Sequence, residues 1–64
     1  MLAFKKNGRI TEVRDTCYPL LGVVANIEYT EEMRQYRAVS YYPMTGDEYR
    51  HIADKLDELN DNTE

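Results

Sequence analysis

The sequence predicts an α+β fold, in which a small antiparallel sheet of about four strands is followed by one C-terminal helix that packs on one face. The expected order of elements is β-β-β-β-α. Three observations indicate it: an Asn7-Gly8 turn signal between two short alternating segments, two more strand-like segments at residues 20–29 and 34–42, and a helix start signal at Thr45.

The first two strands are predicted to form a hairpin around Asn7-Gly8. A two-residue type I′ turn needs positive φ at both central positions, and Asn and Gly tolerate that backbone conformation best. The expected pairing places Lys6 opposite Arg9, which brings two like charges together at the tip. One face of this hairpin is then formed by Leu2, Phe4, Thr11 and Val13.

A second hairpin is predicted from residues 20–29, which are rich in β-branched side chains, and residues 34–42, whose side chains alternate between two faces. Pairing Tyr29 with Arg34 places small side chains of the two strands opposite each other, which leaves a shallow trough for a helix. In this register the face that the helix leaves open carries Val24, Val39 and Tyr41 beside Arg37.

Residues 31–40 also permit a helix capped by Thr30. Its apolar positions do not form a clean stripe, so the strand interpretation is preferred and the helical one ranks second.

The helix start is the most specific signal in the chain. Thr45 is a good N-cap, and Glu48 three residues later completes a capping box. Met44 and Tyr49 stand where a hydrophobic staple would form. The apolar residues that follow at helical spacing are Tyr49, Ile52, Ala53, Leu56 and Leu59.

The length allows one domain, residues 1–60, with residues 61–64 as an acidic tail and fraying expected from Asn60 onward. A chain this short buries only about 60% of the surface that its unfolded form exposes, so its stability margin is small. The single Cys17 excludes an intramolecular disulfide, and there is no Cys/His cluster to bind zinc. Self-association or binding to a larger protein is therefore expected.

The N-terminal residues contain no apolar segment typical of an export signal. The longest uncharged run, residues 16–27, is much shorter than the roughly twenty residues that span a membrane. We expect a cytoplasmic protein with a reduced thiol and no membrane contact.

The net charge of −4 is unevenly distributed. Residues 1–37 hold six basic and five acidic side chains, whereas residues 38–64 hold two basic and seven acidic ones. The acidic part falls mostly on the predicted helix, where a solvated charged face is the usual explanation.

Catalytic chemistry is not indicated. Cys17 is the one candidate thiol nucleophile, and its one candidate imidazole base, His51, lies on the distant helix. A Gly-rich phosphate loop and a Ser/His/Asp set are both missing from the sequence. We expect neither an enzyme nor a metal, cofactor or small-molecule substrate.

Six tyrosines are many for this length, and tyrosine is enriched at protein–protein interfaces. The leading hypothesis is a non-enzymatic interaction protein of inhibitor, adaptor or regulatory-subunit type. It would bind a larger protein, or a second copy of itself as a homodimer, through a tyrosine-bearing sheet face. The expected partner-binding residues are Tyr36, Arg37, Val39, Tyr41 and Val24.

The alternative is single-stranded nucleic-acid binding through the basic N-terminal hairpin, with a tyrosine ring as a stacking platform. Its residues would be Lys5, Lys6, Arg9, Arg34 and Tyr36. The sequence pI near 4.9 disfavours a phosphate-rich partner, so this hypothesis ranks second.

Overall fold

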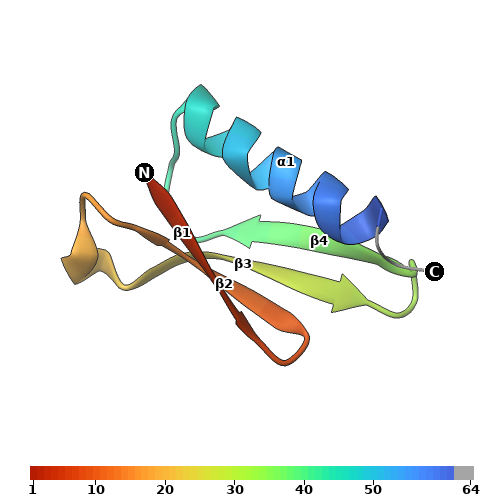
Figure 1. Ribbon diagram of the computed structural model, residues 1–64. Coiled ribbons are helices and arrows are strands. Elements are labelled where there is room, and N and C mark those ends of the chain that lie inside the picture. The colour runs from red at the N-terminus through yellow and green to blue at the C-terminus, as the bar shows by residue number, and fades with distance from the viewer. Residues whose placement is uncertain (62–64) are drawn as a thin grey trace.

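A computed structural model describes residues 1–61 of the chain as a four-stranded antiparallel sheet followed by one helix (Figure 1). The strands are hydrogen-bonded in the order β1-β2-β3-β4, so β1 and β4 are the two sheet edges. The predicted α+β fold and element order are thus confirmed. The elements are β1 (Leu2–Asn7), β2 (Ile10–Asp15), the 3₁₀ turn η1 (Pro19–Leu21), β3 (Val23–Thr30), β4 (Gln35–Ser40) and α1 (Gly46–Asp61).

The first hairpin pairs Asn7 with Ile10, so its two-residue loop is Gly8-Arg9 and not Asn7-Gly8. Gly8 has φ 66°, and Arg9 is not among the residues with positive φ. That pattern belongs to a type II′ turn, which has glycine at its first central position, so the predicted type I′ turn is wrong. The observed pairing of β1 with β2 differs from the predicted pairing by two residues. Such a shift keeps each side chain on its face, and the predicted apolar face is correct.

The second hairpin shows a similar shift, because Tyr29 pairs with Tyr36 and not with Arg34. The turn between the strands covers residues 31–34, and Arg34 closes it with φ 53°. Because residues 35–40 pair with β3 as a strand, the helical interpretation of residues 31–40 is wrong.

A β-bulge on β3 explains why one residue predicted to lie on the surface is buried. Val13 pairs with Ala25 and Arg14 pairs with Val23, which leaves Val24 as the extra residue on β3. A bulge interrupts the two-residue alternation. As a result Val24 and Ala25 are both buried, and the expectation that Val24 lies on the open face is wrong.

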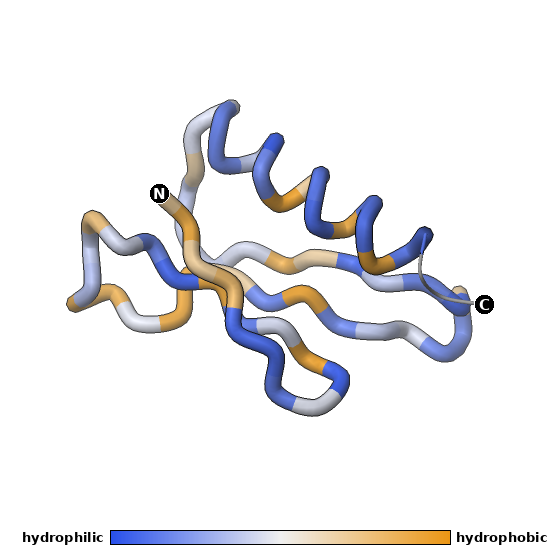
Figure 2. The backbone as a smooth tube through the Cα atoms, in the orientation of Figure 1, coloured by the Kyte–Doolittle hydropathy of each residue, from blue (hydrophilic) through white to orange (hydrophobic). Residues whose placement is uncertain are grey.

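The core lies between the sheet and α1. Its buried residues are Leu2, Val13, Val24, Ala25, Ile27 and Ile52, and Phe4, Tyr36, Met44, Leu56 and Leu59 pack against them. Figure 2 shows apolar segments of α1 on the side that faces the sheet. The predicted apolar stripe of the helix is only partly buried. Ile52 is buried, whereas Tyr49 and Ala53 are exposed beside β4.

The predicted capping box at the start of α1 is confirmed. The Thr45 N–H donates to Glu48 Oε1 at 2.9 Å, and the Glu48 N–H donates to Thr45 Oγ1 at 3.2 Å. These reciprocal bonds satisfy two backbone donors at the start of the helix. At the other end, α1 continues through Asp61, so Asn60 and Asp61 are part of the helix. The rest of the predicted tail, residues 62–64, lies outside the described residues.

Candidate functional site

The face of the sheet opposite α1 is largely polar. Opposite charges face each other across its strands, with Lys5 opposite Glu12 and Glu28 opposite Arg37. Glu12 Oε1 also accepts a hydrogen bond from Arg14 Nη1 at 3.0 Å. This pattern is typical of a solvated sheet face and indicates no broad apolar patch.

Apolar surface on that face gathers at the β4 side. Val39 is 46% exposed and Tyr41, which follows β4 directly, is 54% exposed. The Tyr41 ring is held in place because its hydroxyl accepts a hydrogen bond from Asn26 Nδ2 at 2.9 Å, and its N–H donates to the Val24 carbonyl at 2.8 Å. Val39 and Tyr41 therefore form a fixed apolar border along one edge of the sheet.

The backbone of β4 is capped at its beginning by a side chain of α1. The Tyr36 N–H donates to Asn60 Oδ1 at 2.7 Å, and Asn60 Nδ2 donates to the Tyr36 carbonyl at 3.3 Å. The Tyr36 backbone therefore faces away from β3. In an antiparallel ladder the direction of the backbone groups alternates along the strand. The N–H and C=O groups of Ala38 and Ser40 consequently face outward at the edge as well.

An apolar groove runs between β4 and α1 beside these outward groups. It has a volume of about 230 Å³, and Ala38, Ser40, Tyr49, Ala53 and Leu56 contribute to its lining. Ala38 and Ser40 belong to the helix-facing side of the sheet, yet both are exposed. The predicted trough was expected to receive the helix, in a register that differs from the observed one, whereas α1 leaves this groove beside β4 open.

Together these residues form the edge site: Ala38, Val39, Ser40 and Tyr41 of the β4 edge with Tyr49, Ala53 and Leu56 of α1. It combines outward backbone groups with apolar side chains on both sides of one strand. An arrangement of this kind can accept a further β-strand, whose backbone pairs with the edge while its side chains pack on both faces.

The five residues predicted to bind a partner do not share one surface. Arg37, Val39 and Tyr41 do lie on the face opposite α1. Tyr36 lies on the helix side, where its ring packs against the core and meets the Tyr29 ring edge-on at 5.2 Å. Val24 is 4% exposed and belongs to the core.

From the sequence, Ala38 and Ser40 were expected only as small residues under the helix; their outward backbone groups and the bonds of Asn60 to the Tyr36 backbone were not expected. Small neutral residues in a strand carry no functional signal of their own. The one cue was Asn60 near the end of an otherwise helix-favouring segment, where asparagine is a weak helix former and needs another reason to be present.

The residues of the nucleic-acid alternative are only partly available for binding. Arg9 forms an ion pair with Glu31, and its guanidinium carbon Cζ lies 5.8 Å from the centre of the Tyr29 ring. The hydrogen bond to Glu31 raises the pKa of the Arg9 guanidinium above its ordinary value. Tyr36, the expected stacking platform, is half-buried. The exposed residues of the set are Lys5, Lys6, Arg9 and Arg34.

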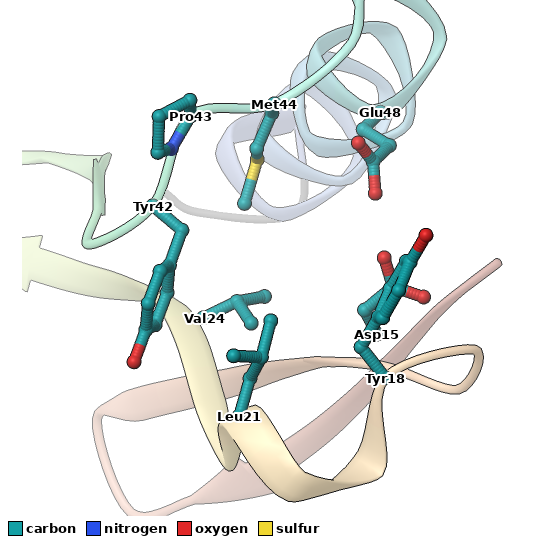
Figure 3. A pocket seen from close by; sticks show the side chains of 8 residues that line it. All are labelled: Asp15, Tyr18, Leu21, Val24, Tyr42, Pro43, Met44 and Glu48. Atoms are coloured by element: carbon teal, nitrogen blue, oxygen red, sulfur yellow. The ribbon is translucent and has the colours of Figure 1, made fainter.

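A second concavity lies between the η1 segment, the linker after β4 and the start of α1 (Figure 3). Its volume is about 170 Å³, below the roughly 300–1,000 Å³ of typical ligand pockets. Asp15 Oδ1 accepts the Cys17 N–H at 2.9 Å, and this bond is the main cause that lowers the pKa of Asp15. The lining residues are Asp15, Tyr18, Leu21, Val24, Tyr42, Pro43, Met44 and Glu48.

A catalytic arrangement does not form around the two candidate residues. Cys17 is exposed, and its Sγ lies 3.7 Å from the Met1 amino group. His51 lines a different, shallow depression together with Phe4 and Lys55. Within residues 1–61, no group of three or more His, Cys, Asp or Glu side chains is placed to hold a metal ion.

Exposed apolar residues, not expected from the sequence, also gather next to the second concavity. Leu20 is fully exposed, and Tyr18, Leu21 and Tyr42 are exposed around the concavity. Leu20 and Leu21 were assigned to a strand, but Pro19 begins a 3₁₀ turn there, and β3 starts only at Val23.

No family model matches the chain, and neither a curated protein nor a solved structure is found to match it. Among residues 1–61, α1 is the one α-helix, and it lacks the length and apolarity needed to cross a membrane.

Proposed function

We propose that this chain is a small non-enzymatic protein-interaction protein, of inhibitor, adaptor or regulatory-subunit type, that binds its partner at the edge site. The observation that supports it is the outward backbone of Ala38 and Ser40, which lies between apolar side chains on both faces of β4. Sheet edges are usually protected by charges, proline or a covering element, because an uncovered edge pairs with other chains.

The two edges of the sheet differ in this respect. β1 carries the consecutive charges Lys5 and Lys6, a common protection against pairing. β4 carries a single charge, Arg37, and within residues 1–61 a side chain caps its backbone only at Tyr36. This contrast favours β4 as the edge that receives a partner. Cys17, a free exposed thiol, fits a reducing compartment, so a cytoplasmic location is part of the proposal.

Affinity capture from cells that express the protein tests the proposal, with an Ala38→Pro variant as the decisive comparison. Proline removes the outward N–H of Ala38 while every hydrogen bond to β3 is kept, and edge strands tolerate proline at such positions. We expect the wild-type chain to retain a protein partner that the Ala38→Pro variant loses.

The matched control is the double variant Lys5→Ala with Arg9→Ala, which changes the basic hairpin and leaves β4 intact. It should retain the same partner. Capture that is equal for wild type and Ala38→Pro, with both proteins folded by circular dichroism, would overturn the proposal. Capture of RNA that the hairpin variant loses would favour the nucleic-acid alternative.

A further inference from the structure

We infer that the partner at the edge site is a second copy of this chain, which joins β4 to β4 in antiparallel pairing around a two-fold axis at Val39. This inference rests on the proposed function and specifies its partner. It follows from which backbone groups of β4 remain open, from the side chains that the pairing brings together, and from the charges on the exposed side of α1.

The outward backbone groups fix the register of such a pairing. Ala38 of one copy would lie opposite Ser40 of the other, and the two symmetric pairs would use the outward N–H and C=O of both residues. Moving the axis to Ala38 would require the backbone of Tyr36, which Asn60 already binds. Moving it to Ser40 would require Tyr42, which lies beyond the end of β4.

The same register brings compatible side chains together on the open face. Val39 meets its own copy at the axis, in a close non-hydrogen-bonded pair. Arg37 lies opposite Tyr41 of the second copy, where a guanidinium over an aromatic ring is attractive. Since Arg37 is the single charged residue of β4, no like charges are opposed along the strand pair.

The exposed side of α1 carries opposite charges that would face each other in two antiparallel copies of the helix. Ala53 faces the groove beside β4, and Arg50 and Asp57 stand three residues before it and four residues after it on the same side of the helix. Both are exposed, and Arg50 bonds to Asp47 within its own helix. Two antiparallel copies of α1 centred between Ala53 and Asp54 bring Arg50 of each copy to Asp57 of the other.

The pairing would also cover the apolar surface that the single chain leaves exposed. Tyr49 is 49% exposed, Val39 is 46% exposed and Ala38 is exposed on the helix side. All three line the groove between β4 and α1. Burial of this surface would supplement the small core of a 64-residue chain, for which oligomerisation is a common source of stability.

A disulfide experiment tests both the partner and the register. In a Cys17→Ser background, Val39→Cys places two thiols across the axis, at a spacing that suits a disulfide. We expect rapid formation of a covalent dimer under mild oxidation. The control, Arg37→Cys in the same background, faces Tyr41 of the second copy and should cross-link at least about tenfold more slowly.

Sedimentation equilibrium provides a measurement without cross-links. The wild-type mass should rise from 7.6 kDa toward twice that value with concentration. Ala38→Pro should raise the dissociation constant at least about tenfold, because each copy loses an intermolecular donor. Arg50→Asp and Asp57→Arg should each weaken the dimer, and the double variant should restore it, provided that circular dichroism shows every variant folded.

A wild-type chain that stays at 7.6 kDa up to about 1 mM would overturn the second-copy inference. In that case a partner captured by wild type and lost by Ala38→Pro would still support the proposed function, so the two failures are distinguishable. A dimer that cross-links equally at positions 37 and 39 would contradict the axis at Val39 and overturn the inference as well.

Discussion

Replacing Asn60 with alanine removes the side chain that caps the β4 edge at Tyr36. Asn60 makes two hydrogen bonds with the Tyr36 backbone, at 2.7 and 3.3 Å, in a partly buried position. Each such bond contributes roughly 0.5–1.5 kcal/mol, and alanine regains roughly 0.5 kcal/mol as the better helix former. The expected net loss is about 0.5–2.5 kcal/mol in the free energy of unfolding.

Urea unfolding at a concentration where the chain is monomeric measures this loss, and a thermal scan should show a midpoint lower by roughly 4–8 °C per kcal/mol. Asp61→Ala is the matched control, because Asp61 is the next residue of α1 and is exposed. Asn60→Asp keeps the acceptor for the Tyr36 N–H, loses the donor, and should be intermediate. Equal stability of the Asn60→Ala and Asp61→Ala variants would refute the capping role.

Three further substitutions test local features of the fold. Thr45→Ala breaks the capping box and should cost about 1 kcal/mol in urea unfolding, whereas an unchanged midpoint would contradict the box. Gly8→Val forces a β-branched side chain to φ 66°, and the loss should reach at least about 1–2 kcal/mol; a fully stable variant would argue against the observed turn. The pKa of Asp15 is lowered in the folded chain, mainly by the hydrogen bond from the Cys17 N–H. The ionised carboxylate therefore stabilises the fold at pH values above its ordinary pKa of 3.8. This contribution is lost as the pH falls through the lowered pKa, and Asp15→Asn should make stability less dependent on pH in that acid range; an identical pH profile would exclude this role.

The helix and the strand faces could be predicted from the sequence because their signals are local. The capping box depends on Thr45 and Glu48, which are three residues apart, and both predicted bonds are present. Strand faces follow from two-residue alternation, so they stayed correct even where Tyr29 pairs with Tyr36 and not with Arg34. Pairing shifts of two residues leave this pattern unchanged, and the sequence therefore cannot detect them.

The bulge and the edge could not be predicted, because both depend on contacts between distant segments. Val24 is buried because the pairing of β3 with β2 leaves it as the extra residue of a bulge. No residue near it in the sequence signals this bulge. The bonds between Asn60 and Tyr36 join residues 24 positions apart. The exposed border of Val39 and Tyr41 followed from alternation, whereas the open backbone of Ala38 and Ser40 became evident only once Asn60 was placed.

Amide hydrogen exchange along β4 tests the edge site most directly. The N–H groups of Arg37 and Val39 face β3 and should exchange slowly at every protein concentration. The N–H groups of Ala38 and Ser40 should exchange rapidly at a low concentration at which sedimentation equilibrium finds the monomer, and become protected at a concentration at which it finds the dimer. Rapid exchange of Ala38 and Ser40 at both concentrations, also after addition of a protein captured by the wild-type chain, would contradict strand pairing at this edge.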